Sequence, residues 1–131
     1  MTQNLELTTA RPFRILVIED DAEVARLMCL SLQRAGLEYQ VASDGPSALQ
    51  AFGEKQPHLV LLDWMLPNMG GQEVLDALRV QSDVPVLVVS ALADESTMGS
   101  FRGADGQIGK PFNPMRLLRR VRELLAERYE S

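Results

Sequence analysis

The sequence has one cysteine, no long apolar run and no excess of positive charge. The single cysteine, Cys29, excludes an internal disulfide bond and makes a reducing cytoplasm the expected compartment. No apolar stretch approaches the length of a membrane span, and the N-terminus lacks the basic-then-apolar plan of a signal peptide, so no membrane partner is expected. A formal net charge of −5 argues against binding nucleic acid by general electrostatic attraction.

Length and composition are those of one globular domain. The 131 residues are 46% hydrophobic and 24% charged, which is ordinary for a folded domain with its own core. Residues 1–12 show no sustained hydrophobic period and end at a proline, so they are predicted to form a flexible arm. We expect the folded domain over residues 13–128, followed by a short tail over 129–131.

Short apolar runs alternate with amphipathic stretches along this domain. Five strands are predicted, at residues 14–18, 39–42, 58–62, 86–89 and 107–109. Five helices are predicted after them, at residues 21–35, 46–53, 72–81, 94–102 and 113–128. Strands that alternate with helices need crossover connections, which produce a parallel sheet with helices on both faces. The fold class expected from the pattern is therefore α/β.

Polar residues follow four of the five predicted strands. The acidic pair Glu19-Asp20 follows the first strand, Asp63 the third, Ser90 the fourth and Lys110 the fifth. Because parallel strands end at one edge of the sheet, these side chains are expected to converge there. Carboxylates brought together repel one another unless a cation lies among them, and oxygen ligands suit Mg²⁺. Asp63 is then the candidate nucleophile for a phosphoryl group, Lys110 its counter-charge and Ser90 a hydroxyl donor.

Each of these residues also has an ordinary structural interpretation. An aspartate after a strand, such as Asp63, usually caps a turn, and an acidic pair such as Glu19-Asp20 usually caps a helix. Ser90 could satisfy a strand end, and Lys110 could be a surface side chain. Taken one at a time, these interpretations are the better ones. Their joint occurrence at successive strand ends favours a functional site.

Five stretches of the chain resemble the receiver domain of two-component response regulators. They lie at residues 15–21, 61–67, 86–91, 103–106 and 110–112, and the resemblance covers about residues 13–128. It implies a flavodoxin-like three-layer sandwich with the strand order 2-1-3-4-5 and five helices. It also implies a signalling switch rather than a conventional enzyme, because such domains catalyse only their own phosphorylation and dephosphorylation.

The resemblance implies a role for each residue at the strand ends. Asp63 accepts a phosphoryl group from a histidine kinase or a phosphotransfer protein. Ser90 bonds that phosphoryl group, and Lys110 pairs with it. Mg²⁺ is expected on oxygen atoms of four residues: Glu19 (through water), Asp20, Asp63 and the main-chain carbonyl of Met65.

The region after the fourth strand departs from this family pattern. Gln107 stands three residues before the lysine, at the switch position that couples to Ser90 and is usually aromatic. A glutamine cannot gain the same hydrophobic energy on moving between exposed and buried positions. The segment 90–110 is also about two residues short, which trims the fourth helix. We therefore expect intact phosphorylation chemistry with a non-standard output face; the alternative is a receiver-like interaction module that acts without phosphorylation.

The last predicted helix carries five of the 13 basic residues: Arg116, Arg119, Arg120, Arg122 and Arg128. Interleaved glutamates and the absence of an aromatic platform favour a solvated or protein-facing surface over direct binding of nucleic acid. The expected partner is a downstream protein or a C-terminal output domain. A homodimer through the fourth helix, fifth strand and fifth helix is a further possibility.

Overall fold

The computed structural model describes residues 12–94, 96 and 101–130. Its strands are β1 (Arg14–Ile18), β2 (Glu38–Ala42), β3 (Leu59–Leu62), β4 (Val86–Ser90) and β5 (Gly106–Gly109). Its helices are α2 (Ala22–Arg34), α3 (Gly45–Glu54), α4 (Gly71–Gln81) and α5 (Pro114–Tyr129). The predicted arm over 1–12 lies outside the described residues except for Pro12, as does most of the predicted helix over 94–102. No helix in the described part of the chain is long and apolar enough to cross a membrane.

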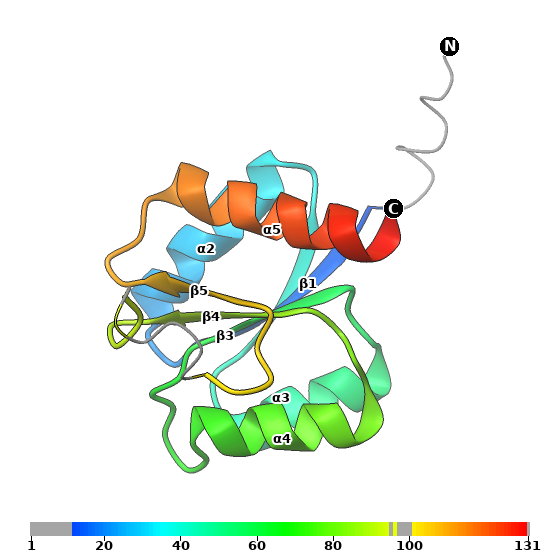
Figure 1. Cartoon of the computed structure of the whole chain (residues 1–131), viewed down its shortest axis with the longest axis vertical. Helices are drawn as coiled ribbons and strands as arrows, with labels where there is room; N and C mark the ends of the chain where they lie inside the picture. Colours follow the sequence, from blue (N-terminus) through cyan, green and yellow to red (C-terminus); the bar gives the residue numbers. More distant parts are fainter. Residues whose placement is uncertain (1–11, 95, 97–100, 131) are drawn as a thin grey trace.

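The five strands form one parallel sheet in the order β2-β1-β3-β4-β5. Helices α2 and α5 cover one face of the sheet, and α3 and α4 cover the other (Figure 1). The α/β class, the three layers and the strand order are therefore as predicted. Of the five expected helices, four lie within the described residues, and most element bounds agree with the prediction to within one residue.

Strand β3 is buried at all four positions because both of its faces are covered. Leu59 and Leu61 pack in the cluster beneath α2 and α5, whereas Val60 and Leu62 pack in the cluster beneath α3 and α4. This alternation follows from the two-residue period of a strand. Cys29 of α2 is buried in the first cluster, and burial raises the pKa of its thiol. A continuous apolar run thus places the residue that follows it, Asp63, at the end of the central strand.

Polar side chains cap the starts of α2, α3 and α5. The Asp21 carboxylate accepts hydrogen bonds from the amides of Glu23 and Val24, at 2.9 and 3.3 Å, and so begins α2. Asn113 caps α5 in the same way. Helix α2 gives way to Gly36, whose φ of +79° is a conformation that glycine adopts readily. These caps fix where the chain turns away from the carboxyl edge of the sheet.

Candidate functional site

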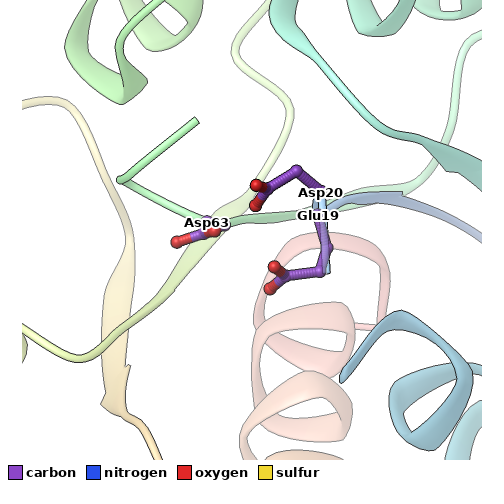
Figure 2. A group of neighbouring side chains, drawn as sticks. All are labelled: Glu19, Asp20 and Asp63. Carbon is purple, nitrogen blue, oxygen red and sulfur yellow. The ribbon is translucent and has the colours of Figure 1, made fainter. Parts of the chain in front are cut away.

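Three carboxylates meet at the carboxyl end of the sheet (Figure 2). Glu19 and Asp20 follow β1, and Asp63 follows the neighbouring strand β3, where Leu62 pairs with Ile18 of β1. One oxygen atom from each of the three carboxylates lies within 4.8 Å of the other two. Glu19 and Asp63 are buried, whereas Asp20 is exposed. The structure thus brings these three residues together, as strand order predicts.

The carboxylate of Asp63 is held by contacts on both oxygen atoms. Its Oδ1 accepts a hydrogen bond from the Met65 amide at 3.1 Å, and its Oδ2 lies 3.5 Å from Nζ of Lys110. The Asp63 amide donates to the carbonyl of Ile18 at 2.9 Å, which fixes the main chain beside β1. With 4% of its surface exposed, Asp63 is a buried and oriented carboxylate next to a cation.

Lys110 lies closer to Glu19 than to Asp63. Its Nζ is 2.8 Å from Oε1 of Glu19, which makes this the shorter of its two ion pairs. Burial opposes the charged form of Lys110, but the contact with Glu19 and the charge of Asp63 outweigh it, so the pKa of Lys110 is raised. Burial also raises the pKa of Glu19, although Lys110 and the Asp21 amide stabilise its charged form. One lysine therefore partly neutralises the acidic cluster.

Ser90 ends β4 as a completely buried hydroxyl. Its Oγ accepts a hydrogen bond from the Leu92 amide at 3.2 Å. Its carbonyl accepts the Lys110 amide at 3.0 Å and the Ala93 amide at 3.1 Å. A main-chain hydrogen bond thus links Ser90 to Lys110. Ser90 ends β4 and Lys110 follows β5, and both strands lie on the same side of β3.

The acidic cluster suits a divalent cation. All of its ligand atoms are carboxylate oxygens, which hard cations such as Mg²⁺ prefer. Oε1 of Glu19 is buried against the Lys110 ammonium at 2.8 Å, and a carboxylate oxygen has a second lone pair that can accept a hydrogen bond from a metal-bound water. One lysine against three carboxylates leaves two negative charges, which a divalent cation would balance. The donor set and the charge both fit Mg²⁺.

Two residues of the expected site lie at its margin. Met65 is 61% exposed, and its amide rather than its side chain contacts Asp63; the role of its carbonyl as a metal ligand stays a prediction. Gln107 is half-buried, and its Nε2 donates a hydrogen bond to the carbonyl of Asp94 at 2.7 Å. The sequence showed the absence of an aromatic ring at position 107 but gave no sign of this contact.

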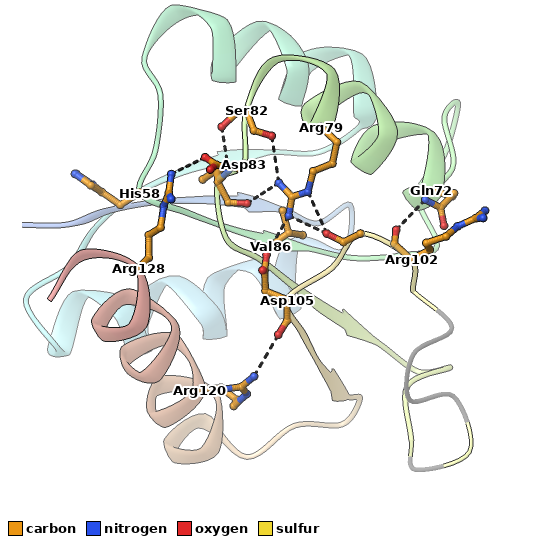
Figure 3. A network of polar contacts seen from close by, with 12 residues as sticks. His58, Gln72, Arg79, Ser82, Asp83, Val86, Arg102, Asp105, Arg120 and Arg128 are labelled. Carbon is orange, nitrogen blue, oxygen red and sulfur yellow. Dashed lines mark hydrogen bonds and ion pairs between the residues drawn. The ribbon is translucent and has the colours of Figure 1, made fainter. Parts of the chain in front are cut away.

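Arg79 is a structural residue that sequence reasoning missed. Its guanidinium donates to the carbonyl of Gly103 through Nε and Nη2, at 3.1 and 2.8 Å, and to that of Val84 through Nη1 at 2.7 Å. It also pairs with Asp105, whose Oδ2 accepts the Val86 amide (Figure 3). Arg79 thus ties the end of α4 to the segment before β5. A basic residue near a helix end was the only available signal.

Comparison with known proteins agrees with this geometry. Residues 15–122 match the family profile described as the response regulator receiver domain. The chain is 44% identical over 114 residues to the DNA-binding response regulator MtrA of Mycolicibacterium paratuberculosis. It is 41% identical over 114 residues to the probable transcriptional regulator ycf27 of Porphyridium aerugineum. These matches cover 86% of this chain but 51% and 48% of the relatives, so the chain spans about half of their length.

Two solved structures share the fold along their whole length. A CheY-like receiver domain protein of Methanospirillum hungatei is 29% identical with a TM-score of 0.83, and the match covers 92% of this chain and 98% of that one. The BeF3-activated receiver domain of Klebsiella pneumoniae RstA is 32% identical with a TM-score of 0.78, over 86% of this chain and 97% of that one. With its acidic cluster at the end of β1 and β3, this chain belongs to the response regulator receiver domain family of two-component signalling.

Proposed function

We propose that Asp63 accepts a phosphoryl group from a histidine kinase or a phosphotransfer protein and that the chain is a phosphorylation switch. The observation that carries the proposal is the pairing of a buried Asp63 carboxylate with Lys110 on one side and Glu19 and Asp20 on the other. A buried carboxylate surrounded in this way is prepared both to attack phosphorus and to tolerate the charge that it gains.

In the proposed reaction an oxygen of Asp63 attacks the phosphorus of a phosphohistidine. A P–O bond forms and the P–N bond breaks, and the donor imidazole leaves as a neutral ring because its other nitrogen already carries a proton. The Met65 amide orients the attacking carboxylate. Lys110, already held 3.5 Å from Oδ2, would compensate the charge of the transferred group. Hydrolysis reverses the state when water attacks phosphorus and the Asp63 carboxylate leaves.

Glu19, Asp20 and Asp63, with the carbonyl of Met65, are the residues we assign to Mg²⁺. The bound ion would supply charge neutralisation for the phosphoryl oxygens. Ser90 is assigned the hydrogen bond to the phosphoryl group. Because the Leu92 amide already donates to Ser90 Oγ, the hydroxyl proton of Ser90 is free to be donated elsewhere.

The output partner is proposed to bind along β5 and α5. A groove of ≈ 610 Å³ lies between these elements, and Arg116, Arg119 and Arg120 are among the residues that line it. MtrA and ycf27 are described as a DNA-binding and a transcriptional regulator, and this chain matches about half of each, which supports a link to an output domain or a downstream protein. The net charge of −5 argues against direct contact of this domain with DNA. A homodimer through the same face is the other arrangement; sedimentation with and without phosphorylation separates the two.

The test is intact mass after incubation with Mg²⁺ and a small acyl-phosphate donor. The expected result is a gain of one phosphoryl group that requires Mg²⁺ and is lost in Asp63→Asn. Asp76→Asn is the matched control, because Asp76 is an exposed aspartate of α4 outside the acidic cluster. This variant should be phosphorylated as the parent chain is.

The alternative, a receiver-like module that acts without phosphorylation, makes the opposite prediction. It would be supported if neither the acyl phosphate nor a panel of histidine kinases modified Asp63 and if Mg²⁺ did not bind. Phosphorylation that persisted in Asp63→Asn would instead move the acceptor to another residue.

A further inference from the structure

The loop that follows Ser90 lies over one face of β5. Gln107 and Gly109 lie on that face, because residues two apart on a strand face the same way. The Nε2 of Gln107 donates to the carbonyl of Asp94 at 2.7 Å. Asp94 in turn accepts hydrogen bonds from the amide and hydroxyl of Ser96, at 2.8 and 2.6 Å. Gln107 therefore fastens the far end of this loop to the sheet.

Gly109 allows the middle of the same loop to approach the strand. A Cβ atom at position 109 would lie 2.6 Å from the carbonyl oxygen of Ala93, closer than such contacts are found. Only a residue without a side chain accommodates the loop at this distance. Residues 91–94 thus contact β5 at two points. One is the hydrogen bond from the Gln107 side-chain amide, and the other is the close approach of Ala93 to the backbone of Gly109.

This loop determines how the Ser90 hydroxyl is presented. The Leu92 amide donates to Ser90 Oγ, so the position of Leu92 sets the rotation of the hydroxyl and leaves its proton available. The carbonyl of Ser90 accepts the Lys110 amide, which ties the start of the loop to the residue after β5. The short main-chain segment 92–94 therefore links the bond at Gln107 to the bond at Ser90.

We infer that Gln107 is a positioning residue for the phosphoryl site: its hydrogen bond to the Asp94 carbonyl holds the 91–94 loop so that Ser90 can donate to a phosphoryl group on Asp63. This inference rests on the proposed function. Relatives with the usual pattern have an aromatic side chain here that changes position. This chain instead has a glutamine whose hydrogen bond to the Asp94 carbonyl orders the loop in advance. Pre-ordering lowers the entropy that must be lost when the phosphoryl group is bound.

The test measures binding of beryllofluoride, a phosphoryl mimic, at saturating Mg²⁺. Gln107→Met keeps the length of the side chain but removes the donor. It should weaken beryllofluoride binding by about three- to tenfold, the effect of one lost hydrogen bond, with Mg²⁺ affinity unchanged. In Gln107→Met the amide of Leu92 should also exchange faster with solvent. Gln107→Lys, which restores a donor at similar reach, should recover most of the affinity.

Gly109→Ala is an independent variant, because the added methyl group pushes Ala93 away without touching Gln107. It should weaken beryllofluoride binding in the same direction, and its melting temperature is measured alongside to confirm folding. Unchanged or tighter binding by Gln107→Met, or an equal loss of Mg²⁺ affinity, would overturn the inference. Failure of the parent chain itself to bind beryllofluoride would instead overturn the proposed function.

Discussion

At the scale of single residues, Lys110 links the two buried carboxylates of the site. Its ammonium group is 2.8 Å from a carboxylate oxygen of Glu19 and 3.5 Å from one of Asp63, so it lies between the two carboxylates. The same charge that would attract a phosphoryl group also repels a metal ion from the neighbouring oxygens. Lys110 should therefore have opposite effects on the two ligands of the site.

Lys110→Met, which keeps the length of the side chain and removes its charge, tests this expectation. Mg²⁺ should bind more tightly, by roughly fivefold, because a positive charge beside its ligands is gone. Phosphorylation by an acyl phosphate should slow by more than about tenfold. Mg²⁺ binding is followed by the fluorescence of Trp64, the only tryptophan, which we expect to change because Trp64 directly follows Asp63. Lys55→Met at the other, exposed lysine is the control, and weaker Mg²⁺ binding by Lys110→Met would contradict the assignment.

At the scale of elements, α4 and the segment before β5 act as one unit. Arg79 joins them through the Gly103 carbonyl and the Asp105 carboxylate, and Gln72 of α4 donates to the carbonyl of Arg102 at 3.1 Å (Figure 3). Phe101 in the same segment packs edge-on against Trp64, with ring centroids 4.8 Å apart. These contacts hold the chain beside the loop that follows Asp63.

Arg79→Met should destabilise the protein by about 1–3 kcal/mol, chiefly because it leaves the carbonyl group of the buried Val84 without this donor; the Gly103 carbonyl, in an exposed residue, can turn to water instead. Urea unfolding measures the change. Arg79→Lys should restore only part of it, because an ammonium cannot reproduce the planar fork. Arg102→Met is the control, since only the carbonyl of Arg102 takes part in the bond to Gln72. An Arg79→Met protein as stable as the parent would show that the network contributes no net stability.

At the scale of the whole molecule, an aromatic cluster closes the end of the sheet opposite to the site. Phe13, His58 and Tyr129 lie with ring centroids 5.0–5.5 Å apart, and the Tyr129 hydroxyl donates to the His58 carbonyl at 2.7 Å. Nδ1 of His58 accepts the Arg14 amide at 2.9 Å. This cluster joins β1, β3 and the end of α5, and it places His58 at the end of β3 opposite to Asp63.

The His58 cluster should make stability depend on pH. Burial, together with the charge of Arg14, lowers the pKa of His58 below its usual value. The unfolded chain therefore takes up more protons than the folded protein as the pH falls through about 6.5, and stability is lost on acidification. Urea unfolding at about pH 7.5 and about pH 5.5 measures this loss. His58→Asn retains an acceptor near Nδ1 without titrating in this range, so it should lose less stability; an equal loss would assign the effect to other groups.

The order of the elements and the identity of the acidic site were determined by the sequence alone. A continuous apolar run before Asp63 requires a central buried strand, and alternation of strands with helices requires that all strand ends share one edge. Helix caps such as Asp21 and Asn113 are equally local, because each bonds amides only two or three residues away. Such short-range rules explain why the sequence alone groups Glu19, Asp20 and Asp63.

Contacts between distant segments were decided only by the tertiary structure. Three sets of contacts join residues from different elements. They are the ion pair of Lys110 with Glu19, the hydrogen bond of Gln107 to Asp94, and the network around Arg79. Their side chains have many rotamers, and their partners include main-chain carbonyls, which carry no signature in the sequence. Folding supplies the distances that select one partner among many. The sequence accordingly predicts which groups meet at the site, while packing decides how they are held.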